Sequence, residues 1–196
     1  MSGMILYCGT SNKGKLREFQ LAALDFEIRP IEAPPPEEHG KTFEENARIK
    51  ALYYGSKVNG WVFADDSGLE VDALNGAPGI HSARFAGPDA TDRDNNDLLL
   101  SKLRGVADRR ARFVCVIALA RGGEVVRTFR GVVEGQIIDS ERGPNGFGYD
   151  PMFFYEPFGC TFGEAPDSRK MQVSHRAQAL GKMFDFLRNV AAGLRL

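Results

Sequence analysis

The chain has 196 residues, 43% of them hydrophobic, and its 25 basic residues nearly balance its 26 acidic ones. This length and hydrophobic content predict one domain, residues 1–196, with a sizeable core. A net charge near zero excludes the broad basic surface that holds a long nucleic acid by its phosphates, so we expect no polymeric nucleic-acid partner. Small charged ligands remain compatible with this balance.

The cysteines and the apolar runs indicate a compartment. Cys8, Cys115 and Cys160 are an odd number scattered among apolar neighbours, which predicts buried thiols rather than a disulfide framework or a zinc site. The longest internal apolar run, residues 113–120, is too short to cross a bilayer, and no secretory segment is recognisable. We therefore expect a cytoplasmic protein with no membrane partner.

Strands and helices are expected to alternate in the first half of the chain. Thr42 and Glu45 have the spacing of a capping box, which predicts a helix start. The prolines at 34–36 exclude a helix in the linker that precedes Thr42. In chain order, the expected elements are a strand at 4–9, a polar loop at 10–15, an amphipathic helix after it, a strand near 26–31, a linker at 33–41, a helix from Thr42 to Asn59-Gly60 and a strand at 61–65.

The second half is expected to contain more strand. Gly122 and Gly123 separate two runs rich in β-branched residues, which is typical of a β-hairpin. The expected elements are an acidic turn at 65–68, residues 69–74, a helix near 91–103, hairpin strands at 111–120 and 124–133 with a possible extension at 135–139, a Gly/Pro-rich loop at 143–151, residues 152–155 and a final helix from Ser174 with Ala177, Leu180, Phe184 and Leu187 inward.

The polar loop at 10–15 has the features of a phosphate cradle. It leaves a strand and enters a helix, where backbone N–H groups and the helix dipole favour an anion. It is not a P-loop, because Leu16 follows Lys15 where the P-loop has Ser or Thr. The alternative is a helix cap followed by solvated lysines. The candidate residues are Thr10, Ser11, Asn12, Lys13, Gly14 and Lys15.

Two adjacent carboxylates form the second candidate. Asp65 and Asp66 should point to opposite sides of their strand, so that one of them, which we take to be Asp66, faces a ligand. Carboxylates near a phosphate cradle are what Mg²⁺ uses, and Glu38 adds another. Lys50 lies one turn after Asn46 on the expected helix. The alternatives are a plain acidic turn and a solvated helix lysine.

The third and fourth candidates are a loop and a helix start. Phe147 and Tyr149 flank Gly148 and precede Asp150 in a loop of glycines and prolines, which indicates a flat ligand, although a ring there can also simply plug the core. His175 and Arg176 follow Ser174 in the first turn of the expected final helix, where the helix dipole disfavours cations. Their position therefore favours a functional role, and the alternative is that they are ordinary solvated side chains.

Six motifs follow one another along the chain: 10-TSNKGK-15, 42-TFEENARIKA-51, 65-DDSGLEVDAL-74, 78-PGIHSARFAG-87, 146-GFGYDPMF-153 and 174-SHRAQAL-180. Together, in this order, they resemble the inosine triphosphate pyrophosphatase family, which removes non-canonical purine nucleotides. The resemblance runs from end to end of the chain.

The resemblance implies a fold, an activity and partners. The fold would be an elongated, two-lobed α/β domain around a long mixed β-sheet, with flanking helices and a central nucleotide cleft. The activity would be Mg²⁺-assisted hydrolysis of ITP, dITP or XTP to the nucleoside monophosphate and pyrophosphate. The partner would be this small purine nucleotide, and the protein would be a homodimer.

The resemblance also implies roles for the candidate residues. The loop at 10–15 and Lys50 would bind the triphosphate, Glu38 and Asp66 the metal, and Asp66, with Ser67 beside it, would be the catalytic centre. Phe147 and Tyr149 would sandwich the purine. Gly148 and Asp150 would lie beside it, and Lys170, His175 and Arg176 would read its edge. Ser11 stands where relatives often have glycine, and His39 makes the motif around Glu38 looser.

Three alternatives remain open at the level of sequence. If Asp66 binds the metal, the proton of the attacking water can pass to Asp65 or to solvent instead. A non-catalytic nucleotide sensor would use the same cradle and rings. A pyrimidine-directed or generic nucleoside triphosphate diphosphatase with a similar architecture would differ in its substrate profile.

Overall fold

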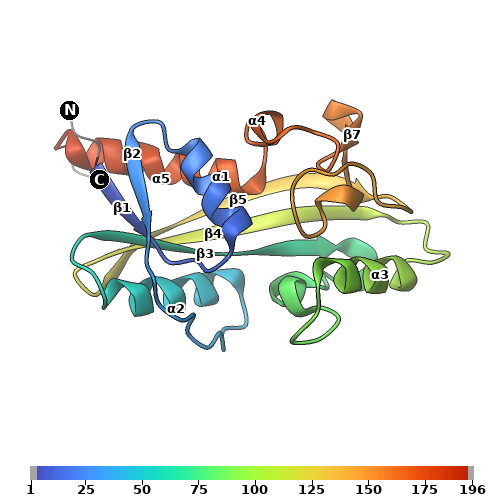
Figure 1. Cartoon of the computed structure of the whole chain (residues 1–196), viewed down its shortest axis with the longest axis horizontal. Helices are drawn as coiled ribbons and strands as arrows, with labels where there is room; N and C mark the ends of the chain where they lie inside the picture. The colour runs from blue at the N-terminus through green and yellow to red at the C-terminus, as the bar shows by residue number, and fades with distance from the viewer. Residues whose placement is uncertain (1–3, 194–196) are drawn as a thin grey trace. The chain divides into compact units, whose positions relative to one another are not determined.

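The computed structural model describes residues 4–193, which form an alternating α/β chain (Figure 1). Short 3-10 turns are present as η1 (Asp72–Leu74), η2 (Gly79–Arg84), η3 (Asp150–Met152) and η4 (Glu156–Phe158). The helices and strands are β1 (Met4–Cys8), α1 (Lys13–Ala22), β2 (Phe26–Pro30), α2 (Phe43–Gly55), β3 (Trp61–Val71), α3 (Asp92–Lys102), β4 (Arg110–Arg121), β5 (Glu124–Ile137), β6 (Phe153–Tyr155), β7 (Cys160–Thr161), α4 (Asp167–Lys170) and α5 (His175–Ala191).

The strands form one mixed sheet of seven strands in the order β2-β1-β3-β4-β5-β6-β7. β1 is parallel to β2 and to β3, whereas β6 is antiparallel to β5 and to β7. Because β1, α1 and parallel β2 follow one another, the N-terminal segment is a βαβ unit. The predicted α/β class with a mixed sheet and flanking helices is confirmed. The elongated outline, the central cleft and the single-domain boundary at 1–196 stay predictions.

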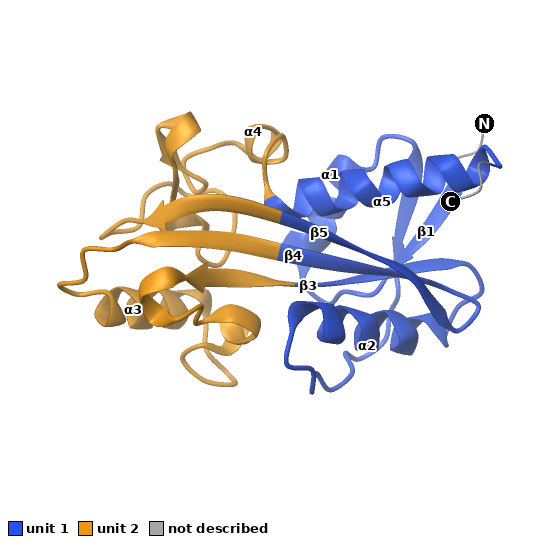
Figure 2. Cartoon of the chain, turned by 180° about the vertical axis from the view of Figure 1, so that it is seen from behind, with its two compact units in different colours: residues 1–66, 115–131, 175–196 blue, residues 67–114, 132–174 orange. Residues whose placement is uncertain are grey.

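Two compact units divide the chain (Figure 2). Unit 1 comprises residues 1–66, 115–131 and 175–196, and unit 2 comprises residues 67–114 and 132–174. The division cuts β3 between Asp66 and Ser67, so the two halves of the acidic motif belong to different units. Each unit has its own buried side chains, and the candidate residues fall into both.

Unit 1 is a three-layer arrangement. Helices α1 and α5 cover one face of its strands and α2 covers the other (Figures 1 and 2). Phe19 of α1 meets Phe63 of β3 edge-on at 5.2 Å between ring centroids, and Phe26 stacks on Phe184 of α5 at 4.8 Å. These contacts follow from the helical spacing of apolar residues that the sequence shows, except that Ala177 is only half-buried and Ala179 takes its inward position.

Unit 2 has a second core, which contains a cluster of aromatic rings. Phe113 packs against Phe153 at 4.5 Å between centroids, and Phe153 against Phe162 at 5.1 Å. Gly135 permits this packing, since a Cβ there would lie 2.6 Å from the Phe153 ring. The buried members of this core are Leu69, Val71, Leu99, Leu103, Ala111, Phe113, Val133, Ile137, Tyr149, Met152, Phe153 and Phe162.

The acidic motif is part of a strand, not a turn. The prediction of a turn at 65–68 was wrong, because β3 runs without interruption from Trp61 to Val71. The local composition favours a turn, but contacts with other segments decide. A Cβ on Gly68 would lie 2.4 Å from the Gly79 carbonyl oxygen and from Ser82 Oγ, so only glycine lets η2 pack on the strand here.

Other predicted boundaries are confirmed in part. Thr42 caps α2 by accepting from the Glu45 N–H (3.1 Å), but the Glu45 carboxylate accepts from the Lys41 N–H (2.6 Å), so the capping box is incomplete. The helix ends at Gly55 instead of reaching Asn59-Gly60. The hairpin is confirmed, with Gly122 and Gly123 at positive φ and β5 extended to Ile137.

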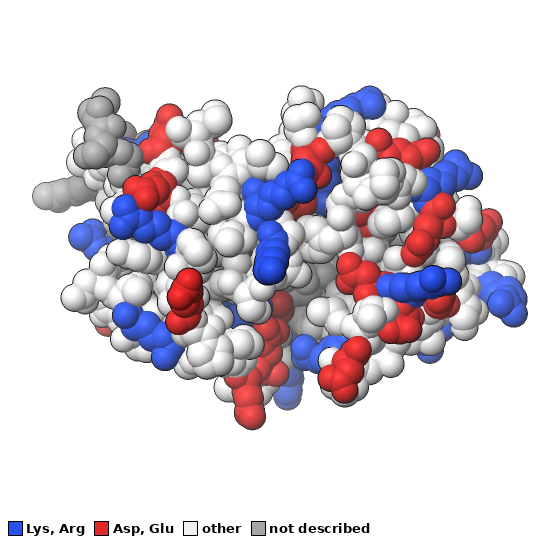
Figure 3. Space-filling view, in the orientation of Figure 1, with Lys and Arg blue, Asp and Glu red and all other residues white. Residues whose placement is uncertain are grey.

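The cysteines and the helices agree with the composition. All three cysteines are unbridged, and Cys8 and Cys115 are buried while Cys160 is half-buried. Across residues 4–193, none of the helices combines the length and the apolar character needed to span a membrane. On the face drawn in Figure 3, acidic and basic side chains are intermixed, as the near-zero net charge predicts.

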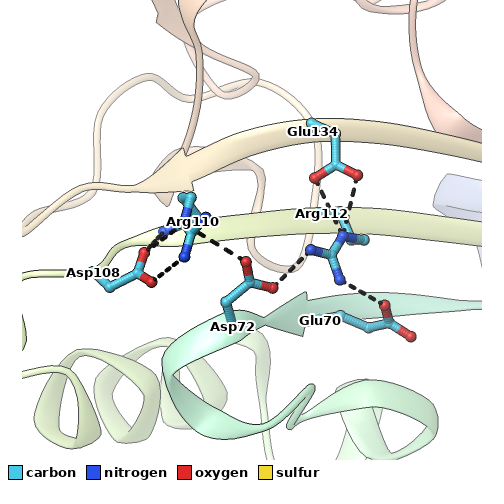
Figure 4. Close-up of polar contacts among 6 residues, drawn as sticks. All are labelled: Glu70, Asp72, Asp108, Arg110, Arg112 and Glu134. Carbon is cyan, nitrogen blue, oxygen red and sulfur yellow. Dashed lines mark hydrogen bonds and ion pairs between the residues drawn. The ribbon is translucent and has the colours of Figure 1, made fainter.

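A network of ion pairs crosses β3, β4 and β5 in unit 2 (Figure 4). Arg112 contacts Asp72 at 2.7 Å, Glu134 at 3.1 Å and Glu70 at 3.5 Å. Because cross-strand neighbours of opposite charge stabilise one register, this network helps to align the three strands. Arg110, beside Asp108, is more exposed and adds less.

Gly131 of β5 allows α5 to lie directly on the sheet of unit 1. A Cβ at this position would lie 2.0 Å from the His175 carbonyl oxygen and 2.8 Å from the Ala179 nitrogen. Both are backbone atoms, which no rotamer change can move. Gly181, on the exposed side of the same helix, has no atom within 4 Å of such a Cβ.

Gly131→Ala should therefore lower the free energy of unfolding by at least about 2 kcal/mol, because a methyl group overpacks the contact between β5 and α5. Gly181→Ala is the matched control and should raise it by up to about 1 kcal/mol through helix propensity. Urea denaturation followed by circular dichroism measures both. Equal effects of the two substitutions would contradict the close approach at Gly131.

Candidate active site

The polar loop leads directly into α1. Asn12 caps the helix by accepting from the Lys15 N–H at 2.9 Å, and its own N–H donates to Thr10 Oγ1 at 3.2 Å. Ser11, Asn12 and Lys13 are exposed, and Gly14 and Lys15 are half-buried. The first turn of α1 therefore exposes Lys13 to solvent at a helix N-terminus, where an anion is favoured, whereas Lys15 is partly covered.

Gly9 fixes where this loop begins, although sequence reasoning did not single it out. A Cβ on Gly9 would lie 2.1 Å from the Tyr54 ring of α2, so the chain can leave β1 here only as glycine. The Gly9 N–H donates to the Phe63 carbonyl at 2.9 Å, which ties the loop to β3. The position of Gly9 between a predicted strand and a polar loop is the feature of the sequence that could have identified it.

Asp65 and Asp66 point to opposite faces of β3, as predicted. Lys15 from α1 lies 2.9 Å from Asp65, whereas Lys50 from α2 lies 3.1 Å from Asp66. Since α1 and α2 cover opposite faces of the sheet in unit 1, each carboxylate meets a cation from a different layer (Figure 1).

Asp65 has a permanent negative charge at neutral pH. Burial alone would raise the pKa of this carboxyl, but the positive charges of Lys15, Arg176 and Lys50 outweigh burial and lower the pKa to about 2. A carboxylate with so low a pKa is a weak proton acceptor. The alternative in which the proton passes to Asp65 is therefore disfavoured.

Asp66 differs from its neighbour in its electrostatics. Burial raises the pKa of its carboxyl, and the charges of Lys50 and Lys15 offset this only in part, so the pKa stays above the ordinary value. Asn46 donates from Nδ2 to Asp66 Oδ2 at 3.2 Å, while Lys50 donates to Oδ1 at 3.1 Å. Asp66 is therefore an oriented carboxylate with the stronger basicity of the pair.

Lys50 is a buried member of this cluster, so its interpretation as a solvated helix lysine was wrong. Its side chain is 9% exposed and contacts both Glu38 (3.0 Å) and Asp66. Burial lowers the pKa of Lys50, but the charges of Asp66, Asp65 and Glu38 outweigh it and keep the ammonium charged. Glu38 thus joins Asp66 around one cation, despite the looser motif that surrounds it.

Asn46 is a site residue that sequence reasoning did not propose. It is fully buried, one turn before Lys50 on α2. Its Oδ1 accepts from the Gly40 N–H at 2.8 Å and its Nδ2 donates to Asp66. Asn46 therefore links the linker that carries Glu38 to the carboxylate in β3. A buried asparagine inside a helix, where this residue is a poor helix former, was the signal.

The carboxylates are too few to enclose a metal ion by themselves. Across residues 4–193, no group of three or more His, Cys, Asp or Glu side chains is arranged to hold a metal. Glu38 and Asp66 share the cation Lys50, so both already face a centre of positive charge. Two carboxylates suit an ion such as Mg²⁺, which takes one or two of them and completes its shell with water and phosphate oxygens.

Arg176 and His175 are buried at the start of α5. Arg176 pairs with Glu18 of α1, and the negative charges of Glu18 and Asp65 outweigh burial to raise the pKa of the guanidinium. This pairing gives Arg176 a structural role in unit 1. Glu18 was missed, because it lies between Arg17 and Phe19 in α1 and resembles an ordinary charged surface residue in sequence. Roles of His175 and Arg176 in reading a purine edge stay predictions.

The two rings of the loop at 143–151 have different environments in unit 2. Phe147 is half-buried, whereas Tyr149 is 5% exposed, lies in the core and donates its hydroxyl to the Ser82 carbonyl at 2.8 Å. Burial raises the pKa of Tyr149. Tyr149 is therefore an anchor of the loop, and Phe147 is the more accessible ring. The predicted sandwich of a base by both rings is not tested.

Asp150 and Lys170 form a buried ion pair that orders the same loop. Lys170 Nζ lies 2.6 Å from Asp150 Oδ2, and both side chains are nearly inaccessible. The same oxygen accepts from the Phe147 N–H at 2.9 Å, and Lys170 Nζ lies 5.2 Å from the Phe147 ring centroid. A Cβ on Gly146 would clash with Asp150 at 2.2 Å, so the loop wraps closely around this carboxylate.

Glu18→Gln should lower the free energy of unfolding by about 3 kcal/mol or more, because it removes the partner of a buried guanidinium. The control is Glu27→Gln, which breaks the exposed pair with Arg29, whose side chains are 54% and 48% exposed, and should change stability far less. Thermal and urea unfolding measure both. A cost for Glu18→Gln as small as that of Glu27→Gln would contradict a structural role for the buried pair.

Comparison with known proteins places this geometry in a family. The sequence model of the Ham1 family matches residues 6–186. The dITP/XTP pyrophosphatase of Syntrophobacter fumaroxidans is 51% identical over 186 residues, which cover 92% of this chain and 80% of that protein. The dITP/XTP pyrophosphatase of Listeria innocua is 46% identical, and the match covers 93% of each chain.

Solved structures give the same result. The Staphylococcus aureus Ham1 protein has 40% identity and a TM-score of 0.84, and the match covers 94% of this chain and 98% of that one. The dITP/XTP pyrophosphatase of Mycobacterium abscessus has 36% identity and a TM-score of 0.72, with 92% and 98% covered. The match in sequence and in fold extends over nearly the whole chain, which therefore belongs to the Ham1 family.

Proposed function

We propose that this chain hydrolyses dITP, ITP and XTP to the nucleoside monophosphate and pyrophosphate. The observation that carries the proposal is Asp66, a buried carboxylate with a raised pKa that Lys50 and Asn46 of α2 orient. The names of relatives that are 46–51% identical over most of the chain support the substrate class.

The reaction needs a base, an electrophile and a stabilised leaving group. Asp66 accepts a proton from water, the water oxygen forms a bond to the α-phosphorus, and the bond from that phosphorus to the bridging oxygen breaks. Pyrophosphate leaves with the electron pair. Lys15, Lys50 and the amides of the loop at 10–15 offset the negative charge that accumulates on the phosphate oxygens.

Glu38 and Asp66 are the residues that would hold Mg²⁺. Mg²⁺ bound there would neutralise phosphate charge and favour the departure of pyrophosphate. Asp66 would hold the ion through its carboxylate, which Asn46 and Lys50 keep oriented by donating to its two oxygens. Charge from Lys15, Lys50 and a metal together matches a triphosphate better than the two lysines alone.

Binding of the base is assigned to residues of unit 2. Phe147 would stack on the purine, because it is the accessible ring of its loop. Lys170 is a donor, which matches the C6 keto oxygen of hypoxanthine or xanthine. Adenine has an amino group at C6, so donors would face a donor and binding would be lost.

Cytoplasmic location and assembly as a homodimer complete the proposal. The first rests on composition and the second on the family resemblance. Size-exclusion chromatography with light scattering tests the dimer, and a monomer at micromolar concentration would contradict it.

Asp66→Asn should keep the fold and lose at least about a hundredfold in kcat, on the order of 3 kcal/mol of transition-state stabilisation. The wild-type protein should likewise lose turnover in EDTA and regain it with Mg²⁺. The control is Asp97→Asn, which changes an exposed aspartate of α3 and should leave kcat unaltered. A folded Asp66→Asn variant with near-normal turnover would remove this residue from the mechanism, and turnover in EDTA would exclude the metal.

The substrate profile should favour ITP, dITP and XTP over ATP by up to about 10⁴, because a site built to bond a group rejects an analogue that lacks it. GTP keeps the C6 oxygen, so the preference over GTP should be smaller. CTP and UTP should fail, since one ring fills a purine site poorly. The measurement is kcat/KM for each nucleotide with pyrophosphate as product. Binding of ITP without turnover would indicate a nucleotide sensor. Equal hydrolysis of all the nucleotides would indicate a generic diphosphatase, and preferential hydrolysis of CTP and UTP would indicate a pyrimidine-directed one.

A further inference from the structure

Gly148 directly follows Phe147 in the Gly/Pro-rich loop. Its φ of +61° lies in the left-handed region, and a Cβ built there would have no atom within 4 Å. The space where a side chain would lie at this position is therefore open. The loop also borders a hollow of about 640 Å³ lined by residues 143–148 and by α3 residues that include Asp92, Asn96 and Asp97.

Two side chains of α3 bond the Gly148 residue on both of its polar groups. The Gly148 N–H donates to Asp92 Oδ2 at 2.7 Å, and Asn96 Nδ2 donates to the Gly148 carbonyl at 3.2 Å. Asp92 and Asn96 are four residues apart, so both lie on one face of the helix. The complete capping box of Thr91 and Asp94 fixes the start of that helix.

The orientation of the Asn96 side chain leaves its buried oxygen without a hydrogen bond within residues 4–193. Its side-chain amide also donates to Glu141 Oε1 at 2.6 Å, so both of its hydrogens are directed to acceptors. Asn96 is 3% exposed, and within residues 4–193 no donor reaches its Oδ1. An unsatisfied buried oxygen is destabilising, so an arrangement selected for stability alone would not retain it.

The same helix also supports Tyr149 indirectly. Asn95 accepts from the Ala86 N–H at 2.9 Å and donates to the Ala83 carbonyl at 3.2 Å, which fixes the segment that contains Ser82. Ser82 in turn accepts the Tyr149 hydroxyl. Helix α3 thus holds the loop at Gly148 and at Tyr149, the two residues that directly follow Phe147.

We propose that Asp92 and Asn96 are positioning residues that hold the Gly148 peptide and thereby set the orientation of the Phe147 ring for the purine base. Neither residue contacts the substrate or the phosphates in this assignment. The inference rests on the proposed function, because it takes Phe147 as the ring that binds the base. It adds the element of the fold that keeps this ring ready for binding.

Asp92→Ala should raise KM for ITP about fivefold, the size expected for one lost hydrogen bond, with kcat within about twofold of the wild type. Inhibition by pyrophosphate, which has no base, should not change. Asp92→Asn keeps an oxygen acceptor and should restore KM. Asp97→Ala removes a charge from the same helix beside the same hollow, where its side chain is 70% exposed, and should behave as wild type.

Amide hydrogen exchange by NMR gives a second readout that needs no turnover. The Gly148 amide should exchange at least about tenfold faster in Asp92→Ala than in Asp97→Ala, because its acceptor is lost. Unchanged exchange, or an unchanged KM in an active Asp92→Ala protein, would overturn the proposal. So would a parallel rise in KM and in the pyrophosphate inhibition constant, which would indicate a general structural defect. Failure of the wild type to hydrolyse ITP would refute the proposed function, while exchange at Gly148 would still decide the role of Asp92.

Discussion

The arrangement of unit 1 depends on two adjacent carboxylates in one strand that need cations from opposite sides. Burying a carboxylate is costly unless a positive charge accompanies it, and Asp65 and Asp66 are both buried. Because successive side chains of a strand alternate, one helix cannot serve both. Lys15 comes from α1 and Lys50 from α2, so the pair constrains both helices to lie against β3 where they do.

Because the two carboxylates have different cationic neighbours, Asp65 and Asp66 have different roles although their side chains are identical. Asp65, surrounded by several cations, keeps its charge and serves as a counter-ion. Asp66, with burial dominating, keeps more basicity and is the better proton acceptor. Two identical side chains thus differ because the number and distance of their cationic neighbours differ. The buried pair of Glu18 and Arg176 extends the charged region on the Asp65 side.

Patterns that depend on neighbours in sequence were predicted well. The order of elements, the start of α2 at Thr42, the hairpin at Gly122-Gly123 and the opposite facing of Asp65 and Asp66 follow from periodicity and turn chemistry. The motifs also identified the family and a set of candidate residues, of which Glu38, Lys50 and Asp66 are in mutual contact through Lys50.

Features that depend on distant segments were not predicted. The motif at 65–68 has the composition of a turn, and it is a strand because η2 packs on Gly68 and cations reach Asp65 and Asp66. The burial of Tyr149 and the pairing of Arg176 with Glu18 depend on partners 67 and 158 residues away in sequence. Local composition contains no information at that range, which is why sequence analysis did not identify these contacts.

The surroundings of Asp65 also determine the reactivity of two cysteines. Burial, followed by the negative charge of Asp65, raises the pKa of both Cys8 and Cys115, and Cys115 Sγ lies 3.9 Å from the Asp65 carboxylate. Oxidants and alkylating agents attack thiolates, and these thiols stay protonated. A carboxylate that serves as counter-ion to Lys15 thereby protects the sulfur atoms next to it from chemical damage.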